Sequence, residues 1–422
     1  MSVFAKAKAS RYKNVKSVLS GLAIVGVGAL VLSGCTPTTE APGGPAEELT
    51  LKIGSLLPLT GELAFLGPPE VAGVGLAVKE VNDAKMGITI DYTEGDSGDP
   101  DNKAYATTLP NLLNAGVSAI VGAAASGVSK LVIDQVTSSG TILISPANTS
   151  PDFTTWDADG LYFRTAPSDL LQGEVLGNLI AADGHSTLGI IAINDAYGTG
   201  LQEVGAKIFE DAGGTVVATE FFNTGDTTFT AQIAAVTAQN PDAIYIVSFD
   251  QAKTIIPGLK DAGFDTSNLY LVDGNTTQYG DSFPAGTLTG AKGTQPGPAL
   301  ADDFQQRLID VYAEQNNGEV LKDFNYAAEA YDAVVLLALA ALAAKSVVGK
   351  DIAAKLQEVS GGSGSGEVAT DFSSAATIIN AGGVVDYDGY SGGIKFDDVG
   401  DPTQATIGIF QYDETNNFIR IN

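Results

Sequence analysis

Residues 114–122 read Asn-Ala-Gly-Val-Ser-Ala-Ile-Val-Gly and carry the chain from the end of an apolar-periodic helix directly into a β-branched strand. Glycine after the last helical residue adopts a positive φ without a Cβ clash, so the helix stops there and a strand can begin. The same unit recurs at Ser139-Gly140, Asp211-Ala212-Gly213 and Asp261-Ala262-Gly263, each time followed by a β-branched run. Helices that alternate with strands predict a parallel sheet.

Two such helix and strand series follow one another, at residues 49–168 and 169–293. Strands such as 188–193 and 243–247 are almost continuously apolar, as expected when helices cover both faces of a sheet. The segment 152–168 is rich in Pro, Asp and Thr, so we expect a crossing between two lobes there. Residues 327–344 form the most apolar helix, and its acidic residues predict a buried core helix rather than a membrane span.

The N-terminus has the composition of an export signal. Five basic residues precede an apolar run at 18–32, and no acidic residue occurs before Glu40. The run ends in Leu32-Ser33-Gly34-Cys35, which resembles the lipobox of bacterial lipoproteins, in which the cysteine is acylated and becomes the first mature residue. We therefore expect residues 1–34 to be a lipoprotein signal peptide, Cys35 to carry lipid and residues 35–48 to be a disordered tether. The alternative is an incidental thiol beside an ordinary cleavage site.

Composition excludes several classes of function. The chain has 50 acidic and 22 basic side chains, and its formal charge of −28 opposes binding to nucleic acid. One histidine, His185, and one cysteine leave no ligand set for a zinc, haem or copper site, so neither a metal nor another cofactor is expected. With Cys35 as the only cysteine there is no intramolecular disulfide.

Two local patterns suggest other chemistry. Residues 389–393 read Gly-Tyr-Ser-Gly-Gly and match the nucleophile elbow of α/β hydrolases, but no histidine follows Ser391 to act as the base. A glycine-rich turn before a strand is the simpler interpretation. The acidic residues 96–101 lack the spacing of an EF-hand, and Asp99-Pro100 fits an N-cap followed by proline at the first helical position.

Two loops are candidate ligand contacts. Residues 122–127 follow the strand 119–121, and residues 145–150 follow the strand 142–144. Both lie at the carboxyl ends of parallel strands, where open α/β sheets bind ligands. Ser126 can present a hydroxyl beside the free N–H groups of the next helix, which suits an anion. Simple helix capping by Ser and Thr explains the same residues equally well.

The chain from residue 49 to its end resembles the leucine/isoleucine/valine-binding protein family, the type I solute receptors of ABC importers. The resemblance lies in ordered motifs along the chain, which are residues 51–61, 66–69, 77–82, 144–151, 163–173, 194–198, 326–334 and 407–412. It implies an α/β fold of two doubly wound parallel-sheet lobes joined by a three-strand hinge. Lobe 1 would comprise residues 49–168 and 294–384, and lobe 2 would comprise residues 169–293 and 385–422.

The resemblance also implies a ligand site in the cleft between the lobes. By position, Ser126, Ala147 and Thr149 match the residues that hold an amino acid's α-carboxylate and α-ammonium, and Asp273 matches an acidic partner of the ammonium. The other positions implied to line the cleft are Tyr197, Phe249, Phe65 and Asn148. The family often has a tyrosine where Phe249 stands, and the adjacent Asp250 adds a charge unusual for an aliphatic pocket.

These observations together predict a monomeric, lipid-anchored solute-binding protein on the outer face of the cell membrane. It would bind a small zwitterion, an aliphatic or branched-chain amino acid, and pass it to ABC permease subunits without catalysis. An amide or urea receptor and a ligand-sensing lobe are alternatives within the same architecture. A secreted hydrolase that uses Ser391 is the alternative from a different class.

Overall fold

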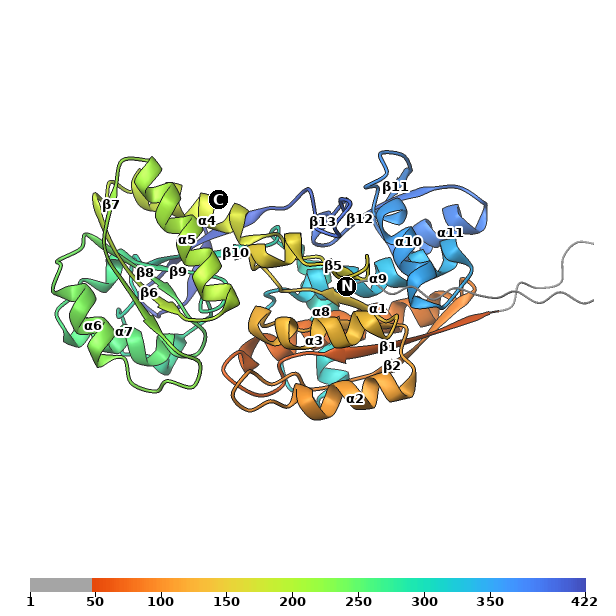
Figure 1. The fold of residues 1–422 in the computed structure, drawn as a ribbon, viewed down its shortest axis with the longest axis horizontal. Coiled ribbons are helices and arrows are strands. Elements are labelled where there is room, and N and C mark those ends of the chain that lie inside the picture. Colours follow the sequence, from red (N-terminus) through yellow and green to blue (C-terminus); the bar gives the residue numbers. More distant parts are fainter. Residues whose placement is uncertain (1–47) are drawn as a thin grey trace, which may run out of the picture. The chain divides into compact units, whose positions relative to one another are not determined.

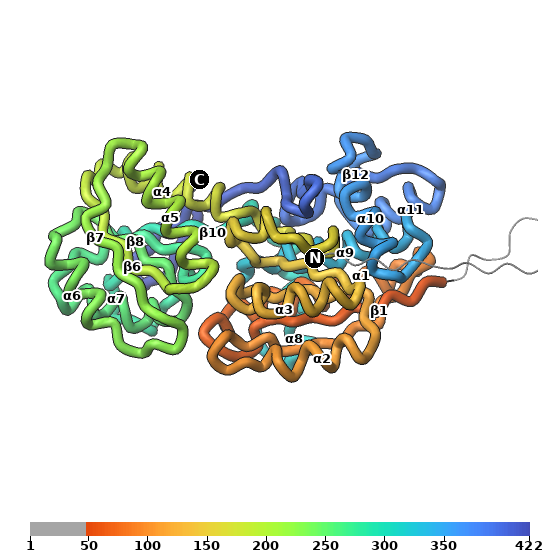
Figure 2. The backbone as a smooth tube through the Cα atoms, in the orientation of Figure 1, coloured from red at the N-terminus to blue at the C-terminus, as the bar shows by residue number. Residues whose placement is uncertain are grey.

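The computed structural model describes residues 48–422, which fold as two lobes (Figure 1). The predicted signal peptide, Cys35 and the predicted tether up to residue 47 lie outside the described residues. Lobe 1 takes its elements from distant parts of the sequence, because the helices around residues 302–380 pack beside the N-terminal strands. The course of the backbone can be followed in Figure 2.

Lobe 1 contains a fully parallel five-stranded sheet in the order β2-β1-β3-β4-β5. Its strands are β1 (Leu49–Leu56), β2 (Ile88–Thr93), β3 (Ala119–Gly122), β4 (Ile142–Ser145) and β5 (Tyr162–Arg164). Its helices are α1 (Gly67–Ala84), α2 (Tyr105–Ala115), α3 (Ser126–Ser138), α8 (Asp302–Gln315), α9 (Ala327–Ala344), α10 (Gly349–Val359) and α11 (Phe372–Asn380).

Helices cover both faces of this sheet, as its apolar strands predict. Successive residues of β3 belong to different apolar cores: Ile120 packs in the core that contains α2 and α3, whereas Val121 packs in the core that contains α1 and α9. All four residues of β3 are buried. Because side chains alternate along a strand, this division places one helical layer on each face.

Lobe 2 contains a seven-stranded sheet in the order β15-β14-β10-β9-β8-β6-β7. Its strands are β6 (Thr187–Ile193), β7 (Thr215–Phe222), β8 (Ala243–Val247), β9 (Leu269–Leu271), β10 (Lys292–Pro296), β14 (Ile407–Tyr412) and β15 (Phe418–Arg420). The strands from β6 to β10 are parallel, and β14 and β15 add an antiparallel edge. The helices are α4 (Asp169–Ala182), α5 (Ala196–Asp211), α6 (Thr230–Thr237) and α7 (Ala252–Asp261).

Short elements complete the two lobes. A small third sheet consists of β11 (Glu367–Ala369), β12 (Val385–Gly389) and β13 (Gly392–Gly393). The short 3-10 helices are η1 (Ala64–Leu66), η2 (Pro151–Thr155), η3 (Thr266–Asn268) and η4 (Gly280–Ser282).

The glycines that punctuate the sequence have the predicted backbone conformation. Gly116, Gly140, Gly213 and Gly263 have φ values of 71°, 79°, 97° and 86°. Gly116 directly follows α2, and its N–H donates to the carbonyl of Leu113 at 3.0 Å. The helix-to-strand transitions that the sequence predicted are therefore confirmed.

The apolar helix predicted at 327–344 is α9, and it lies in the core of lobe 1. Its mean hydropathy is 1.8, but 89% of its length is buried inside the protein. It packs against α1, α8 and the sheet in one continuous apolar core. Burial against protein accounts for its composition, so the prediction of a core helix is confirmed.

The chain crosses between the lobes at positions that differ from two predicted boundaries. Strand β10 belongs to the lobe 2 sheet, so the return to lobe 1 begins after residue 296 and not at 294. Strand β12 remains in lobe 1, because Val385 and Tyr387 are buried in the core that contains α9. The chain rejoins lobe 2 only at β14, at Ile407 and not at residue 385.

Three segments connect the lobes, at 165–168, 297–301 and 397–406, and none of them is a β-strand. Backbone hydrogen bonds tie them together. The N–H of Gly297 donates to the carbonyl of Thr406 at 2.8 Å. The N–H of Arg164, the last residue of β5 before the first connection, donates to the carbonyl of Gly400 at 3.1 Å. The hinge is thus a bundle of three cross-linked connections.

Candidate functional site between the lobes

One cavity takes residues from both lobes. Loops of lobe 1 contribute Ser126 and Ala147, and loops of lobe 2 contribute Tyr197, Phe249 and Asp273. About 250 Å³ lies between its lining atoms, part of it open to solvent. The remaining lining residues are Leu63, Leu66, Ala124, Ala125, Gly274 and Tyr326. Five of the eight ligand-contact residues named from the sequence therefore meet in one pocket, on opposite walls.

The β3–α3 loop presents Ser126 at the amino end of a helix. Ala125 is the N-cap of α3 and has an extended backbone, so Ser126 is the first helical residue. Within residues 48–422, the backbone N–H groups of Ser126 and Gly127 make no hydrogen bond to the backbone. The first turn of a helix carries such unpaired donors, and their dipoles favour a negative charge. This wall of the pocket is therefore suited to a carboxylate.

Asn148 joins the two lobe 1 loops and does not line the pocket. It is fully buried, and its side-chain amide donates to the carbonyls of Ala123 and Ala124 at 2.9 and 2.8 Å. Ser145 reinforces this link, because its hydroxyl donates to the carbonyl of Ala123 at 2.7 Å. Asn148 thus fixes the relative position of the loops that carry Ser126 and Ala147.

Two further predicted residues lie outside the pocket lining. Thr149 is 1% exposed, and its Oγ1 has no hydrogen-bond partner among residues 48–422. A buried hydroxyl without a hydrogen-bond partner costs free energy, so the Thr149 hydroxyl is available to a bound ligand. Phe65 lines a separate cavity beside Pro68, Pro69 and Tyr312.

Asp273 is the centre of the lobe 2 wall. It is 4% exposed, and its Oδ1 accepts hydrogen bonds from Tyr197 at 2.7 Å and from Gln172 at 2.6 Å. Its Oδ2 accepts from Tyr326 at 2.7 Å. Burial raises the pKa of Asp273, and no Lys or Arg of the described chain forms a salt bridge with it. A carboxylate held by neutral donors alone remains available to a cationic ligand group.

Aromatic rings complete this wall. Tyr197 and Phe249 stack with ring centroids 5.4 Å apart and an interplanar angle of 14°. The Tyr197 hydroxyl is fixed by Asp273 and also accepts a hydrogen bond from the N–H of Gly274 at 3.2 Å. The tyrosine therefore turns its polar end towards the carboxylate and offers its ring as an apolar surface.

Asp169 and Gln172 belong to this network but were not assigned from the sequence. Asp169 is the first residue of α4 and is fully buried, and its Oδ2 has no hydrogen-bond partner in the described chain. Burial and the nearby charge of Asp273 raise its pKa well above the ordinary value. The Gln172 amide lies between the two carboxylates, 3.5 Å from Asp169 and 2.6 Å from Asp273. Both residues fall in the motif at 163–173, which was the available signal.

Tyr326 is the other residue that the sequence did not reveal. It precedes the first residue of α9 and has a φ of 61°, in the left-handed region. A bulky side chain rarely adopts this conformation, and such strain persists where the surrounding structure enforces it. Here the Tyr326 hydroxyl reaches from lobe 1 to Asp273 of lobe 2. This hydrogen bond between Tyr326 and Asp273 joins the two lobes directly at the pocket.

Arg164 supports the second loop from behind. It is fully buried, and its guanidinium binds both carboxylate oxygens of Asp401 at 2.6 Å. It also donates to the backbone carbonyls of Asn148 and Ser150, at 3.3 and 2.8 Å. Asp401 lies on the third connection between the lobes, so a single side chain joins the hinge to the loop that flanks Thr149.

The alternative chemistries find no support in the described residues. Ser391 lies in the turn between β12 and β13, and its hydroxyl donates to Asp332 at 2.6 Å. That hydrogen bond gives Ser391 a structural role. No group of three or more potential metal ligands occurs within residues 48–422.

Comparisons with known proteins assign the chain to a family. Residues 50–389 match the family described as periplasmic binding protein. A leucine-, isoleucine-, valine-, threonine- and alanine-binding protein of Pseudomonas aeruginosa is 28% identical over 273 residues, which is 63% of this chain and 72% of that protein. The chemotactic signal transduction system substrate-binding protein BasB of Halobacterium salinarum is 27% identical over 360 residues, covering 81% of this chain and 82% of that protein.

Solved structures show the same fold. The leucine-binding protein LivK of Thermotoga maritima is 22% identical, with a TM-score of 0.70, over 88% of this chain and 98% of that one. The branched-chain amino acid binding protein LivJ of Streptococcus pneumoniae, solved with isoleucine, is 24% identical, with a TM-score of 0.68, over 88% and 100%. Because the family match spans most of the sequence, the chain belongs to the periplasmic binding protein family, whose members are extracytoplasmic solute receptors of type I fold and not enzymes.

Proposed function

We propose that the chain binds an aliphatic amino acid in the pocket between its lobes and delivers it to an ABC importer. The observation that carries the proposal is the placement of Ser126 and Ala147 opposite Asp273 across one pocket. A zwitterion has a negative carboxylate for the lobe 1 wall and a positive ammonium for the lobe 2 wall. Only a closed arrangement lets both lobes touch the solute, so binding shifts the population towards closure.

The carboxylate of the solute would occupy the lobe 1 wall. Its acceptors are matched there by the Ser126 hydroxyl, the free N–H groups at the start of α3 and the unpartnered Thr149 hydroxyl. Thr149 would turn into contact when the solute binds. Hydrogen bonds to a charged group are stronger than neutral ones, and the exclusion of water strengthens them further.

The ammonium group would lie between the Ala147 carbonyl and Asp273. Asp273 is buried without a cationic partner, and burial disfavours its charged form, so an ammonium beside it would favour the carboxylate. Leu63, Leu66 and the stacked Tyr197 and Phe249 rings then surround the side chain of the solute. These apolar surfaces favour leucine, isoleucine or valine over polar amino acids.

Calorimetric titration of the mature chain with leucine, isoleucine and valine tests this proposal. Asp273→Asn removes the charge and keeps the shape, so leucine affinity should fall at least tenfold. Asp250→Asn is the matched control, because Asp250 is half exposed and already paired with Lys253. Equal leucine affinity in the wild type and Asp273→Asn would remove the carboxylate from the site. Binding of acetamide or urea instead of amino acids would favour the amide receptor.

We also propose that Cys35 anchors the protein by lipid to the outer face of the membrane, as a monomer that presents its solute to permease subunits. The support is the apolar run before Leu32-Ser33-Gly34-Cys35 and the extracytoplasmic family. Cys35→Ala in the full precursor should move the protein from the membrane fraction to the soluble one. Retention of the variant in the membrane fraction would contradict a lipid anchor at this position.

A second function, solute sensing, has one specific observation in its favour. The similar BasB protein of Halobacterium salinarum is described as part of a chemotactic signal transduction system. The same closing pocket could report an amino acid to a receptor instead of releasing it to a permease. Uptake of labelled leucine separates the two functions: a strain that lacks this protein loses uptake if the protein serves transport and keeps it if the protein serves sensing.

A further inference from the structure

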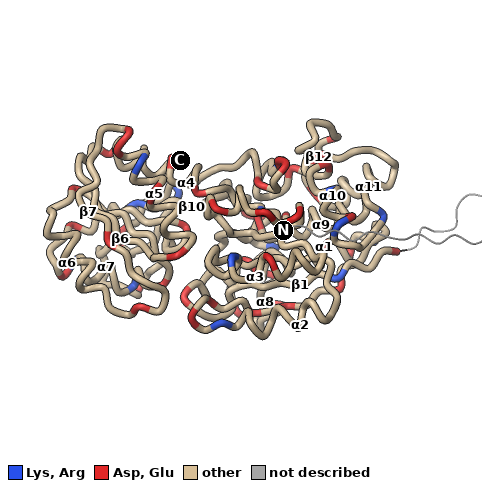
Figure 3. The backbone as a smooth tube through the Cα atoms, in the orientation of Figure 1, with Lys and Arg blue, Asp and Glu red and all other residues tan. Residues whose placement is uncertain are grey.

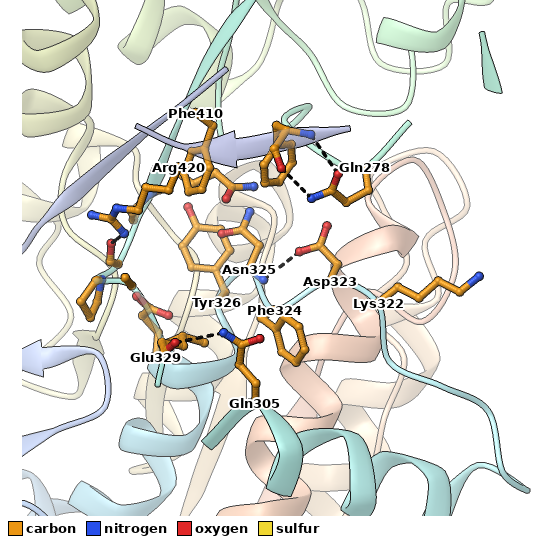
Figure 4. Close-up of a pocket in the computed structure, with 17 residues that line it drawn as sticks. Gln278, Gln305, Lys322, Asp323, Phe324, Asn325, Tyr326, Glu329, Phe410 and Arg420 are labelled. Carbon is orange, nitrogen blue, oxygen red and sulfur yellow. Dashed lines mark hydrogen bonds between the residues drawn. The ribbon is translucent and has the colours of Figure 1, made fainter. Parts of the chain in front are cut away.

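A second and larger cavity adjoins the solute pocket (Figure 4). About 870 Å³ lies between its lining atoms, part of it open to solvent. It is bounded by the hinge connection at 297–300, by strands β10, β14 and β15 of lobe 2, and by the segment 322–326 that leads into α9 of lobe 1. Tyr326 lines both cavities, so the segment before α9 is a wall that the two share.

Arg420 gives this hinge cavity a positive charge. Of the three arginines in residues 48–422, Arg164 and Arg307 form salt bridges and Arg420 forms none. Its Nη1 donates to the carbonyl of Gly297 at 3.0 Å, and its Nε donates to the side-chain and backbone oxygens of Asn422 at 3.2 and 3.4 Å. Only its Nη2 donates to no residue of the described chain. In a protein with a formal charge of −28 and acidic residues throughout both lobes (Figure 3), an arginine without a carboxylate is unusual. The unpaired Nη2 can donate a charge-assisted hydrogen bond to a carboxylate.

The surroundings of Arg420 also suit a carboxylate ligand. Burial raises the pKa of Glu329 to about 8, so this lining residue stays mostly neutral at pH 7 and does not repel an anion. Lys322 adds a second positive charge to the lining and Asp323 a negative one. The local charge of the hinge cavity is therefore not dominated by acidic groups, unlike the protein as a whole.

The rest of the lining suits an aromatic ligand that donates a hydrogen bond. Phe410, Phe418 and Phe324 supply flat apolar surfaces, and the Arg420 guanidinium lies 5.9 Å from the Phe410 ring centre. Asn325 is 7% exposed, and its Oδ1 is buried without a hydrogen-bond partner in the described residues. A buried acceptor of this kind is satisfied by a hydroxyl or N–H group of a ligand.

We propose that the hinge cavity is a second binding site, which takes a small aromatic carboxylate carrying a hydrogen-bond donor. The carboxylate pairs with Arg420, the ring packs on Phe410 and Phe418, and the donor satisfies Asn325. The chemistry differs from that of the solute pocket, which has its carboxylate-binding wall in lobe 1 and an acidic group in lobe 2.

The two sites are coupled through their shared wall. Asn325 donates from its side chain to the backbone carbonyl of Asp273 at 3.3 Å, and the Tyr326 hydroxyl binds the Asp273 carboxylate. A ligand that orders Asn325 and Tyr326 therefore changes the position of Asp273 in the solute pocket. This coupling rests on the proposed function, because it requires that an amino acid binds at Asp273, whereas binding in the hinge cavity does not. Any change in affinity must be reciprocal between the two ligands.

Titration with 4-hydroxyphenylacetate, with and without saturating leucine, tests the proposal. The expected result is one bound probe per chain, which remains bound when leucine occupies the other pocket. Tyramine carries an ammonium group where 4-hydroxyphenylacetate carries its carboxylate. It should not bind the hinge cavity, because Arg420 would repel the ammonium. Displacement of the probe by leucine, or equal binding of tyramine in the presence of leucine, would overturn the proposal.

Variants locate the probe. Arg420→Gln should weaken 4-hydroxyphenylacetate binding at least tenfold, whereas Lys345→Gln, at an exposed residue after α9, should leave it unchanged. Ala299→Trp fills the cavity from an exposed lining position without removing a side-chain hydrogen bond, and it should also block the probe. Wild-type probe affinity in folded Arg420→Gln and Ala299→Trp would place the probe elsewhere. If leucine does not bind the wild type, the proposed function is wrong. The titrations with 4-hydroxyphenylacetate still test the hinge cavity, because they do not require leucine to bind.

Discussion

Burial raises the pKa values of several acidic residues in this protein. Glu329 is 3% exposed, and burial is the main reason that its pKa rises from 4.5 to about 8. Glu70 is fully buried with both carboxylate oxygens unpartnered in the described chain, and its pKa is raised by burial and by Glu329. Burial therefore favours the neutral, protonated form of both carboxyl groups in the folded protein.

The pKa of Glu329 predicts how stability depends on pH. Between pH 4.5 and 8 the folded protein holds a proton on Glu329 that the unfolded chain releases, so this residue makes the protein less stable as pH rises. Glu329→Gln lacks this titration. Its melting temperature should fall less than that of the wild type between pH 5 and pH 8, by a few degrees. Thermal unfolding followed by circular dichroism measures the difference.

The control for this measurement is Glu314→Gln, at an exposed residue of α8, which should follow the wild type. If the wild type and Glu329→Gln lose equal stability over the same pH range, Glu329 does not hold a proton in the folded state.

Residue chemistry was only partly predictable from the sequence. Ser126 and Ala147 were named because they lie in loops that follow predicted strands, whereas Asp273 was named from its position in the family resemblance. Gln172 and Tyr326 were not assigned, because their role depends on Asp273, which lies 101 and 53 residues away. Phe65 was expected in the cleft, but the chain after β1 places it in a neighbouring cavity. Local patterns do not specify which distant residue completes a polar network.

At the scale of elements, glycines defined the transitions from helix to strand and so made the parallel sheets predictable. The positions at which the chain crosses between the lobes were harder to predict from the sequence. The place of strand β12 in lobe 1 depends on Tyr387, whose hydroxyl binds Asp332 of α9 at 2.9 Å. That partner is 55 residues away, so the boundary predicted at residue 385 had no local signal.

The buried pair of Arg164 and Asp401 should stabilise the join between β5, the ligand loop and the hinge. Arg164→Met removes the cation and leaves Asp401, which is 8% exposed, without its partner. Such a change costs about 3–5 kcal/mol. Urea unfolding should therefore show a large loss of stability.

Lys350→Met serves as the comparison, since it breaks an exposed ion pair with Asp159, and solvent-screened pairs of this kind contribute little to stability. A similar, small effect of both substitutions would show that the buried pair does not hold the hinge and loop together.

At the scale of the whole molecule, the two lobes meet across the mouth of the pocket. Glu62 of lobe 1 accepts hydrogen bonds from lobe 2, through its backbone carbonyl from the N–H of Asp250 at 3.1 Å and through its side chain from the N–H of Gly225 at 3.2 Å. Together with the bond from Tyr326 to Asp273, these contacts favour the closed arrangement. Each one contributes only modestly on its own, so a solute that touches both walls can decide between open and closed states.

Small-angle X-ray scattering of the mature chain should therefore show a smaller radius of gyration with saturating leucine than without it. Glu62→Ala loses the side-chain contact, and it should shift the leucine-free protein further towards the open state. A radius of gyration that leucine leaves unchanged would indicate that the lobes do not close on the solute.

A crystal structure of the protein with bound leucine would show directly how the solute lies between the two lobes. We expect the leucine carboxylate to contact Ser126 and Thr149 and its ammonium to contact the Ala147 carbonyl and Asp273. Leucine bound in another place, or in the reverse orientation with its carboxylate towards Asp273, would contradict this expectation.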